Sequence, residues 1–144
     1  MTDDPHHFER FVRAQEGVHA AALAELRAGR KTSHWMWFVF PQLSGLGRSA
    51  TAQQYALDGV AEAHAYLAHP VLGPRLLEAT DAATTAPAHS VDALLGGIDA
   101  LKLRSSMTLF ARASDDPAPF RAVLDRWYAG SEDPVTLRLL RLDE

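Results

Sequence analysis

The segment 33–42 carries the densest run of side chains suited to holding a small molecule, and it reads SHWMWFVFPQ. It holds two of the three tryptophans and two of the six phenylalanines of the chain, and His34 and Gln42 flank this apolar block. Small-molecule pockets use polar groups at the margins of an aromatic wall to orient a ligand. Large aromatic residues also dominate protein cores, where they need no ligand. The run therefore predicts either a pocket wall that includes Trp35 and Trp37 or a core helix.

A glycine-rich turn follows at residues 45–50, where GLGRSA formally satisfies the G-x-G-x-x-G/A pattern. A dinucleotide fingerprint needs a preceding strand in a parallel sheet and an acidic residue at the end of a second strand, about 20 residues later. The chain that follows is an alanine-rich helical pattern, which excludes a Rossmann fold. Gly45, Gly47, Arg48 and Ser49, together with a free helix N-terminus, predict a cradle for an anion or phosphate. The alternative is a tight turn between helices with a solvated arginine.

A third group of reactive side chains lies between residues 99 and 108. On a helix, Asp99 and Lys102 are neighbours, and Lys102 shares a face with Ser105 or Ser106. Lys102 would act as a nucleophile or base only if it were desolvated. Otherwise the pair is an exposed ion pair and the serines are small residues at a helix crossing. Asp99 and Glu62 are the carboxylates near these motifs that could serve as a general base.

Several kinds of chemistry are excluded by what the chain lacks. It has no cysteine, which excludes disulfides, thiol nucleophiles, cysteine-ligated zinc and iron–sulfur clusters. Its seven histidines show neither the H-E-x-x-H spacing nor an accompanying carboxylate cluster, so we expect no metal site. The G-x-S-x-G elbow of serine hydrolases is also absent. We therefore expect no cofactor.

Composition and charge describe an ordinary globular chain of 144 residues, with 47% apolar and 22% charged residues and a net charge of −4. We expect one domain over residues 1–144, with a flexible segment at 1–6. No apolar run approaches the ~20 residues of a membrane span, and the acidic N-terminus lacks a signal pattern, so we expect a cytoplasmic protein. The basic residues are scattered from Arg10 to Arg141, without the stripe that nucleic-acid binding needs. We expect neither nucleic-acid nor membrane partners, and take a monomer as the default.

The apolar periodicity predicts an all-α fold, an irregular orthogonal array of seven to nine short helices with clefts between helix ends. The segment 33–43 is read as a short buried helix because no second segment could supply a partner strand. Its helical phase, and so which tryptophan faces a cleft, stays open. The predicted N-caps are Ser33, Asp58, Ser90, Asp116 and Asp133. The predicted helices span residues 8–28, 33–43, 49–57, 60–67, 71–85, 90–96, 98–113, 117–129 and 134–142.

The string KTSHWMWFVFPQL at 31–43, followed by GLGRS at 45–49, resembles the bacterial family catalogued as domain of unknown function 1810, sometimes labelled calpastatin. The agreement continues through YAL at 55–57, HPVLG at 69–73 and SSMTLF at 105–110, and covers about residues 6–140. The resemblance implies a compact helical fold and no established activity. The recurrent polar positions that it implies are His34, Gln42, Arg48, Ser49, Tyr55, Lys102, Ser105 and Ser106.

These observations together predict one cleft that binds an anionic, phosphorylated or nucleotide-like small molecule. In this interpretation Trp35, Trp37 and Tyr55 form an aromatic wall, while Arg48 and the 45–47 turn hold the anion. Hydrolysis or N-glycosidic cleavage is the reaction considered first, and whether the chain is an enzyme stays open. The alternative is a non-enzymatic interaction module with an aromatic core helix. The binding candidates are His34, Trp35, Trp37, Gln42, Gly45, Gly47, Arg48, Ser49, Tyr55, Lys102, Ser105 and Ser106, and the catalytic candidates are Asp99, Lys102 and Glu62.

Overall fold

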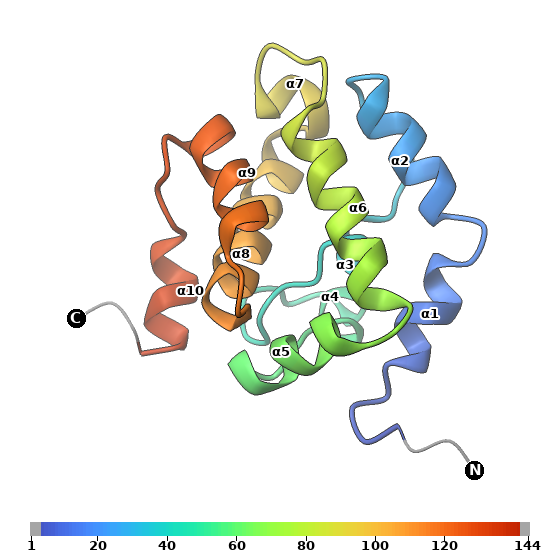
Figure 1. The fold of residues 1–144 in the computed structure, drawn as a ribbon, viewed down its shortest axis with the longest axis vertical. Coiled ribbons are helices and arrows are strands. Elements are labelled where there is room, and N and C mark those ends of the chain that lie inside the picture. Colours follow the sequence, from blue (N-terminus) through green and yellow to red (C-terminus); the bar gives the residue numbers. More distant parts are fainter. Residues whose placement is uncertain (1–3, 142–144) are drawn as a thin grey trace.

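Ten helices build residues 4–141, the part of the chain that this computed structural model describes (Figure 1). Within it the one strand-like feature is an isolated parallel bridge between Leu43 and Leu57, so the predicted all-α class is confirmed. No helix of the described residues is long and apolar enough to cross a bilayer. The helices are α1 (Glu9–Gln15), α2 (His19–Arg27), α3 (Met36–Val39), α4 (Ala50–Gln54), α5 (Val60–Ala68), α6 (Leu72–Thr84), α7 (Val91–Leu95), α8 (Gly97–Ala113), α9 (Ala118–Tyr128) and α10 (Pro134–Leu139).

The first predicted helix, 8–28, is two helices in the structure. Gly17 separates them with φ of 71°, in the left-handed region where glycine carries no steric penalty. The apolar pattern continues across this break, which is why periodicity alone joined α1 to α2. The stop at Gly29 is confirmed, with φ of 83° directly after the C-cap of α2.

Two of the predicted N-caps act as expected. The Ser90 hydroxyl accepts a hydrogen bond from the Ala93 amide (3.0 Å), and the Asp133 carboxylate accepts one from the Thr136 amide (3.0 Å). These bonds start α7 and α10 because each satisfies an amide that has no partner within its helix. α10 ends at Leu139, short of its predicted end at residue 142, which lies outside the described residues.

Three other predicted caps differ in the structure. Gly59, and not Asp58, occupies the N-cap position of α5. α3 is only four residues long and starts after Trp35, while the Ser33 hydroxyl donates a hydrogen bond to Glu25 of α2 instead of capping. α9 starts one residue later than predicted, with Pro117 in the N-cap position.

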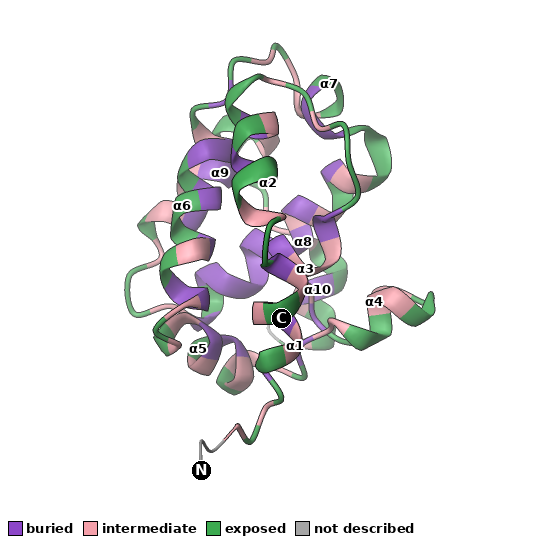
Figure 2. Cartoon of the chain, turned by 90° about the vertical axis from the view of Figure 1, so that its right-hand side faces the viewer, coloured by how far each residue is buried: buried purple, intermediate pink, exposed green. Residues whose placement is uncertain are grey.

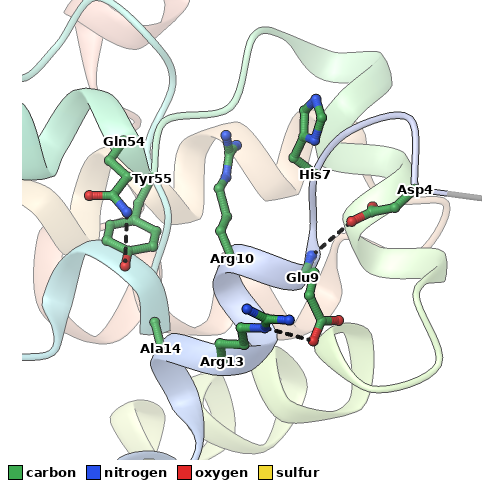
Figure 3. A pocket seen from close by; sticks show the side chains of 8 residues that line it. All are labelled: Asp4, His7, Glu9, Arg10, Arg13, Ala14, Gln54 and Tyr55. Carbon is green, nitrogen blue, oxygen red and sulfur yellow. Dashed lines mark hydrogen bonds and ion pairs between the residues drawn. The ribbon is translucent and has the colours of Figure 1, made fainter.

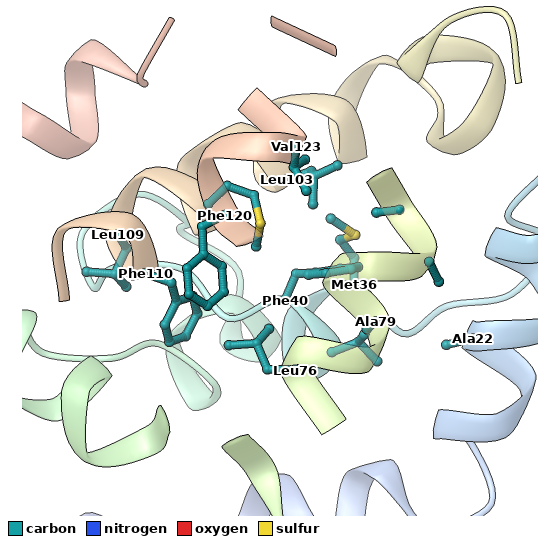
Figure 4. Packing of buried hydrophobic residues seen from close by; sticks show 14 of the residues in the cluster. Ala22, Met36, Phe40, Leu76, Ala79, Leu103, Leu109, Phe110, Phe120 and Val123 are labelled. Carbon is teal, nitrogen blue, oxygen red and sulfur yellow. The ribbon is translucent and has the colours of Figure 1, made fainter. Parts of the chain in front are cut away.

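α8 is the central helix, and ten of its seventeen residues are buried. It packs against α5, α7, α9 and α10, while α6 packs against α2, α5 and α9. Figure 4 shows Phe110 of α8 beside Phe120 of α9, with ring centroids 5.8 Å apart. Figure 2 shows buried residues concentrated along α8 and the faces of α6 and α9 turned toward it. The cleft described below therefore has the most deeply packed helix of the fold as one wall.

The aromatic segment is divided between core and surface. Trp35, Met36 and Phe40 are 0%, 1% and 0% exposed, so they are core residues, as one of the two interpretations of this segment predicts. Trp37 is only half-buried. Because α3 is a single turn with Met36 and Val39 facing inward, Trp37 is directed away from the core, which decides the phase that the sequence left open.

The loop after α3 is held by backbone hydrogen bonds around the Leu43–Leu57 bridge. The Leu57 amide donates to the Gln42 carbonyl (2.9 Å), and the Ser44 amide donates to the Leu57 carbonyl (2.7 Å). The bridge closes the segment that contains the glycine-rich turn and α4, which stands at the edge of the molecule (Figure 2). It thereby sets where Gln42 and Arg48 lie.

Candidate functional site

A cleft of about 600 Å³ lies between the loop that follows α3, the glycine-rich turn, α8 and the start of α10. We call it the α3–α8 cleft. Its volume falls within the range of small-molecule sites, roughly 300–1,000 Å³. Among its lining residues are seven of the residues that the sequence predicts to bind a ligand: Trp37, Gln42, Gly47, Arg48, Ser49, Lys102 and Ser105. Three segments that are separate in the sequence thus converge on one concave surface.

A second, smaller hollow of about 330 Å³ adjoins the α3–α8 cleft. The two share Trp37 and Ile98 in their linings, so the indole of Trp37 stands where they meet. The smaller hollow contains two further predicted residues, His34 and Asp99, beside Lys31. The two hollows are therefore neighbours on either side of Trp37 and Ile98.

Asp99 links two lysines at this junction. Its Oδ2 lies 3.0 Å from Nζ of Lys31 and its Oδ1 lies 3.5 Å from Nζ of Lys102. The Lys102 ammonium also stands 4.8 Å from the centroid of the Trp37 ring, within cation–π range. Lys102 is 22% exposed and lines the α3–α8 cleft, so its ammonium can reach a ligand without losing the aromatic contact.

The charged groups of the two hollows leave a local positive excess. Lys31, Lys102 and Arg48 line the two hollows together with Asp99 and Asp133, three cations and two carboxylates, in a chain whose net charge is −4. Local fields of this kind raise the concentration of oppositely charged ligands at a cleft. The electrostatics of the site therefore favour an anion.

Arg48 is exposed, and its guanidinium makes no hydrogen bond or ion pair with any residue in the described range 4–141. Its backbone is held by the side-chain amide of Gln53, whose Nε2 donates to the Arg48 carbonyl (3.0 Å). The helix N-terminus expected beside it is α4, which is only five residues long, and the Ser49 hydroxyl already accepts from the Ala52 amide (3.1 Å). A ligand at this turn would therefore be bound by the Arg48 side chain more than by the N-terminus of α4.

The two glycines of the turn have different surroundings. A Cβ atom on Gly47 would lie 2.4 Å from Cβ of Ala52, so only glycine lets the turn pack onto α4. Gly45 has φ of 101° and lies beside Leu139 of α10, outside the lining of the cleft. Close packing therefore accounts for the glycine at position 47, and backbone conformation accounts for the glycine at position 45.

Ser105 and Asp133 form the polar floor on the opposite side of the cleft. Ser105 is 5% exposed, and its Oγ lies 3.1 Å from the Leu101 carbonyl and 3.2 Å from Oδ2 of Asp133. The same carboxylate oxygen accepts from the amide and the hydroxyl of Thr136 (3.0 and 2.6 Å). The floor thus combines a buried hydroxyl with a carboxylate whose Oδ2 already has three contacts.

The loop that carries Asp133 is fastened to α8 at several points. Arg104 donates to the carbonyl oxygens of Ser131 and Glu132 (3.0 and 2.9 Å), and Arg112 donates to both carboxylate oxygens of Glu132 (2.7 Å each). The hydrogen bonds that Arg112 donates to Glu132 raise the pKa of Arg112 above its ordinary value. Such charge-assisted, two-pronged contacts fix this wall of the cleft relative to α8.

The remaining predicted residues do not reach the cleft, which corrects the prediction of a single shared site for all of them. Trp35 is in the core. Glu62 lies on α5, where its Oε2 is 3.1 Å from Nδ1 of His6. Ser106 is fully buried, and its hydroxyl has no hydrogen-bond partner among the described residues. These residues were predicted to belong to the site because they stand close in the sequence to residues that do line it, or because they belong to the same motif.

Tyr55 lies instead in a groove at the N-terminal side, about 670 Å³ in volume and larger than the α3–α8 cleft (Figure 3). Several charged groups of this groove contact one another or the backbone, while Nε of Arg10 is buried without a hydrogen-bond partner among the described residues. Glu9 pairs with Arg13 (3.3 Å), and the carboxylate of Asp4 accepts from the Glu9 amide (3.1 Å). The hydrogen bond from the Glu9 amide is the main reason that the pKa of Asp4 lies below its ordinary value. Of the residues predicted to bind a ligand, this groove has Tyr55 and the α3–α8 cleft has seven, so we assign the site to the α3–α8 cleft. Of the segment 1–6, residues 1–3 lie outside the described part.

Sequence reasoning missed Glu25, which positions the segment leading into α3. Its Oε1 accepts from the amides of Thr32 and Ser33 (2.6 and 2.9 Å) and from the Trp35 indole (3.0 Å), and its Oε2 accepts from the Ser33 hydroxyl (2.5 Å). Burial of the carboxylate raises its pKa, but these hydrogen bonds outweigh burial and lower it to about 2. No local motif marks Glu25, because its donors lie seven to ten residues later in the chain.

The apolar lining of the cleft was also missed. Ile98 and Leu101 fit the apolar period of α8, a pattern typical of core residues, yet they are 74% and 66% exposed. Ile98, Leu101, Lys102 and Ser105 follow the i, i+3, i+4, i+7 spacing of one helix face. That face mixes apolar residues with a lysine and a serine, a signal that distinguishes it from a core stripe.

Comparisons with known proteins agree with this architecture. Residues 5–140 match the model of a family described as "Protein of unknown function (DUF1810)". A solved structure, that of the conserved hypothetical protein Rv1873 from Mycobacterium tuberculosis, superposes with a TM-score of 0.93 at 51% sequence identity, covering 96% of this chain and 99% of that chain. No curated protein matches the chain.

Proposed function

The chain belongs to the DUF1810 family, and we propose that it is a small-molecule-binding protein whose α3–α8 cleft takes an anionic ligand, phosphorylated or nucleotide-like. The observation that carries the proposal is the position of Arg48. Its guanidinium has no partner in the described residues, and it stands at the cleft that Trp37 and Lys102 also line. An unpaired guanidinium offers the two-pronged geometry that phosphate and carboxylate groups accept.

Each lining group has a role that its surroundings permit. Arg48 would hold the anion from the glycine-rich turn, and Lys102 would approach it from α8. Lys102 lies 3.5 Å from Asp99, a loose ion pair, so turning toward a ligand costs it little. The indole of Trp37 offers apolar surface to a planar or apolar part of the ligand. The amide of Gln42 and the hydroxyl of Ser105 supply neutral polar contacts.

The proposal includes hydrolysis or N-glycosidic cleavage as the reaction to assay once a ligand is known. Glu62 lies outside both hollows, which leaves Asp99 and Asp133 as the carboxylates at the site. Both oxygens of Asp99 face lysine ammonium groups. Oδ1 of Asp133 makes no hydrogen bond among the described residues, so we propose it as the oxygen that would take a proton from water.

The proposal is tested by thermal shift of the purified protein against nucleotides, ADP-ribose, NAD, sugar phosphates and polyanions. A ligand present at 100 times its Kd stabilises the native state by about 2.7 kcal/mol, which raises the Tm by on the order of 10 °C. Arg48→Ala should abolish the shift. Arg121→Ala, which removes an exposed arginine on α9, should retain it. A panel without any shift, or a shift unchanged in Arg48→Ala, would contradict the proposal.

A further inference from the structure

The exposed large apolar side chains of the described residues are concentrated at one place. There are five of them, and three line the α3–α8 cleft: Ile98, Leu101 and Val135, which are 74%, 66% and 42% exposed. Leu139, 45% exposed, follows one turn after Val135 on α10 and lies beside the glycine-rich turn. Only Leu77 lies elsewhere, on α6.

Single exposed apolar residues are normal on a protein surface, but a contiguous group indicates a surface that is covered in function. Here the group borders a hollow that also contains Arg48 and Lys102. Apolar and cationic groups therefore line the same cleft, whose volume of about 600 Å³ suits a small molecule. A flat patch for a protein partner would not need this concavity.

From this arrangement we infer that the ligand of the α3–α8 cleft is a soluble, single-chain amphiphilic anion, an anionic head group joined to an aliphatic or aryl tail. The inference rests on the proposed function and specifies its ligand class. The head group lies against Arg48 and Lys102. The tail covers Ile98 and Leu101 on α8 and Val135 on α10. A longer tail extends past Ile98 and Trp37, which line both hollows, into the second hollow.

The opposing faces of α8 and α10 explain why the tail binds there. Ile98, Leu101 and Lys102 lie within two turns on the same face of α8, so an anion near Lys102 places its tail over the two apolar side chains. Val135 is the second residue of α10, two positions after Asp133, whose loop Arg104 and Arg112 fasten to α8. The two apolar walls are thus held at a fixed separation before any ligand arrives, which lowers the entropic cost of binding.

The test is a homologous series of n-alkyl phosphates (ethyl, butyl, hexyl and octyl), each kept below its micelle concentration, titrated by calorimetry into the full chain. Each methylene that becomes fully buried should tighten binding about fourfold, until the tail outgrows the site. Leu101→Asn should flatten this dependence on chain length. Leu77→Asn, the same change at an exposed leucine away from the cleft, should leave it intact. Arg48→Ala should weaken all members by a similar factor.

The outcomes separate the two proposals. If the alkyl phosphates bind with an affinity that does not depend on tail length, and nucleotides also bind, the amphiphile inference is overturned and the proposed function stands. Absence of binding by every phosphate would overturn both. Sedimentation with phosphatidylglycerol vesicles is measured in parallel. Binding to vesicles that Leu101→Asn abolishes, without binding of the free alkyl phosphates, would assign the cleft to a membrane lipid and also overturn the inference.

Discussion

Replacing Glu25 by glutamine should destabilise the protein in a pH-dependent way, although no charged residue faces Glu25 in an ion pair among the described residues. The carboxylate receives four hydrogen bonds from Thr32, Ser33 and Trp35, which fasten the segment before α3 onto α2. Glutamine keeps the shape but has only one acceptor oxygen. Its amide nitrogen would face donors, and the negative charge that strengthens all four bonds is lost.

The magnitude follows from the pKa of Glu25, which these bonds lower from 4.5 to about 2. A shift of this size corresponds by linkage to about 3 kcal/mol, and the partial exposure of the side chain reduces it to about 2 kcal/mol. Because the pKa is lower in the folded state, the contribution is fully present above pH 4.5 and is lost as the pH falls toward 2. It should be less than half as large at pH 3 as at pH 7.

Urea unfolding of the wild type and of Glu25→Gln at both pH values measures this contribution. Urea is preferred to guanidinium because it does not screen charges. Glu9→Gln is the control, since Glu9 makes only an exposed pair with Arg13 on α1 and its loss should cost a few tenths of a kcal/mol. A difference between wild type and Glu25→Gln that is as large at pH 3 as at pH 7, or absent at pH 7, would refute the assigned role.

Three further predictions concern stability. Gly73→Ala places a Cβ 2.1 Å from the Leu67 carbonyl oxygen and should cost at least 2 kcal/mol in urea unfolding, whereas Gly97→Ala meets nothing within 4 Å and should be neutral or slightly stabilising. Burial raises the pKa of Tyr66 and Tyr128, so absorbance at high pH should show these two phenols ionising only as the protein unfolds. Asp133→Ala removes the cap of α10 and should lower the unfolding free energy by about 1–2 kcal/mol, with no such loss in Asp58→Ala.

Features decided within a few residues could be predicted from the sequence. Ser90 and Asp133 accept hydrogen bonds from amides three residues later, so their caps are visible as local patterns. The break at Gly17 was missed because apolar positions continue at helical spacing on both sides of it. A helix interrupted by one left-handed residue keeps nearly the same apolar pattern as an unbroken one.

Part of the cleft was predictable because some of its residues belong to short local motifs. Arg48 and Lys102 belong to short motifs whose residue types suit an anion, and both line the cleft. Asp133 and Val135 reach it only because four positions of α8 fasten the loop 131–133, an arrangement that depends on packing between segments about 25 residues apart. Such a contact leaves no trace in the local pattern of either segment.

The two faces of α8 separate stability from ligand binding in this fold. The buried face, with Leu103, Met107 and Phe110 fully excluded from solvent, holds the core together. The cleft face exposes Ile98 and Leu101, so replacing them by polar residues creates no cavity and should change the unfolding free energy by less than about 0.5 kcal/mol. A loss of ligand binding in these variants without a loss of stability would be expected of a binding surface. Ile98 and Leu101 do not have the burial that a purely structural role for this face would require, and they are grouped with Val135 at the cleft, which supports the inference that a ligand covers them.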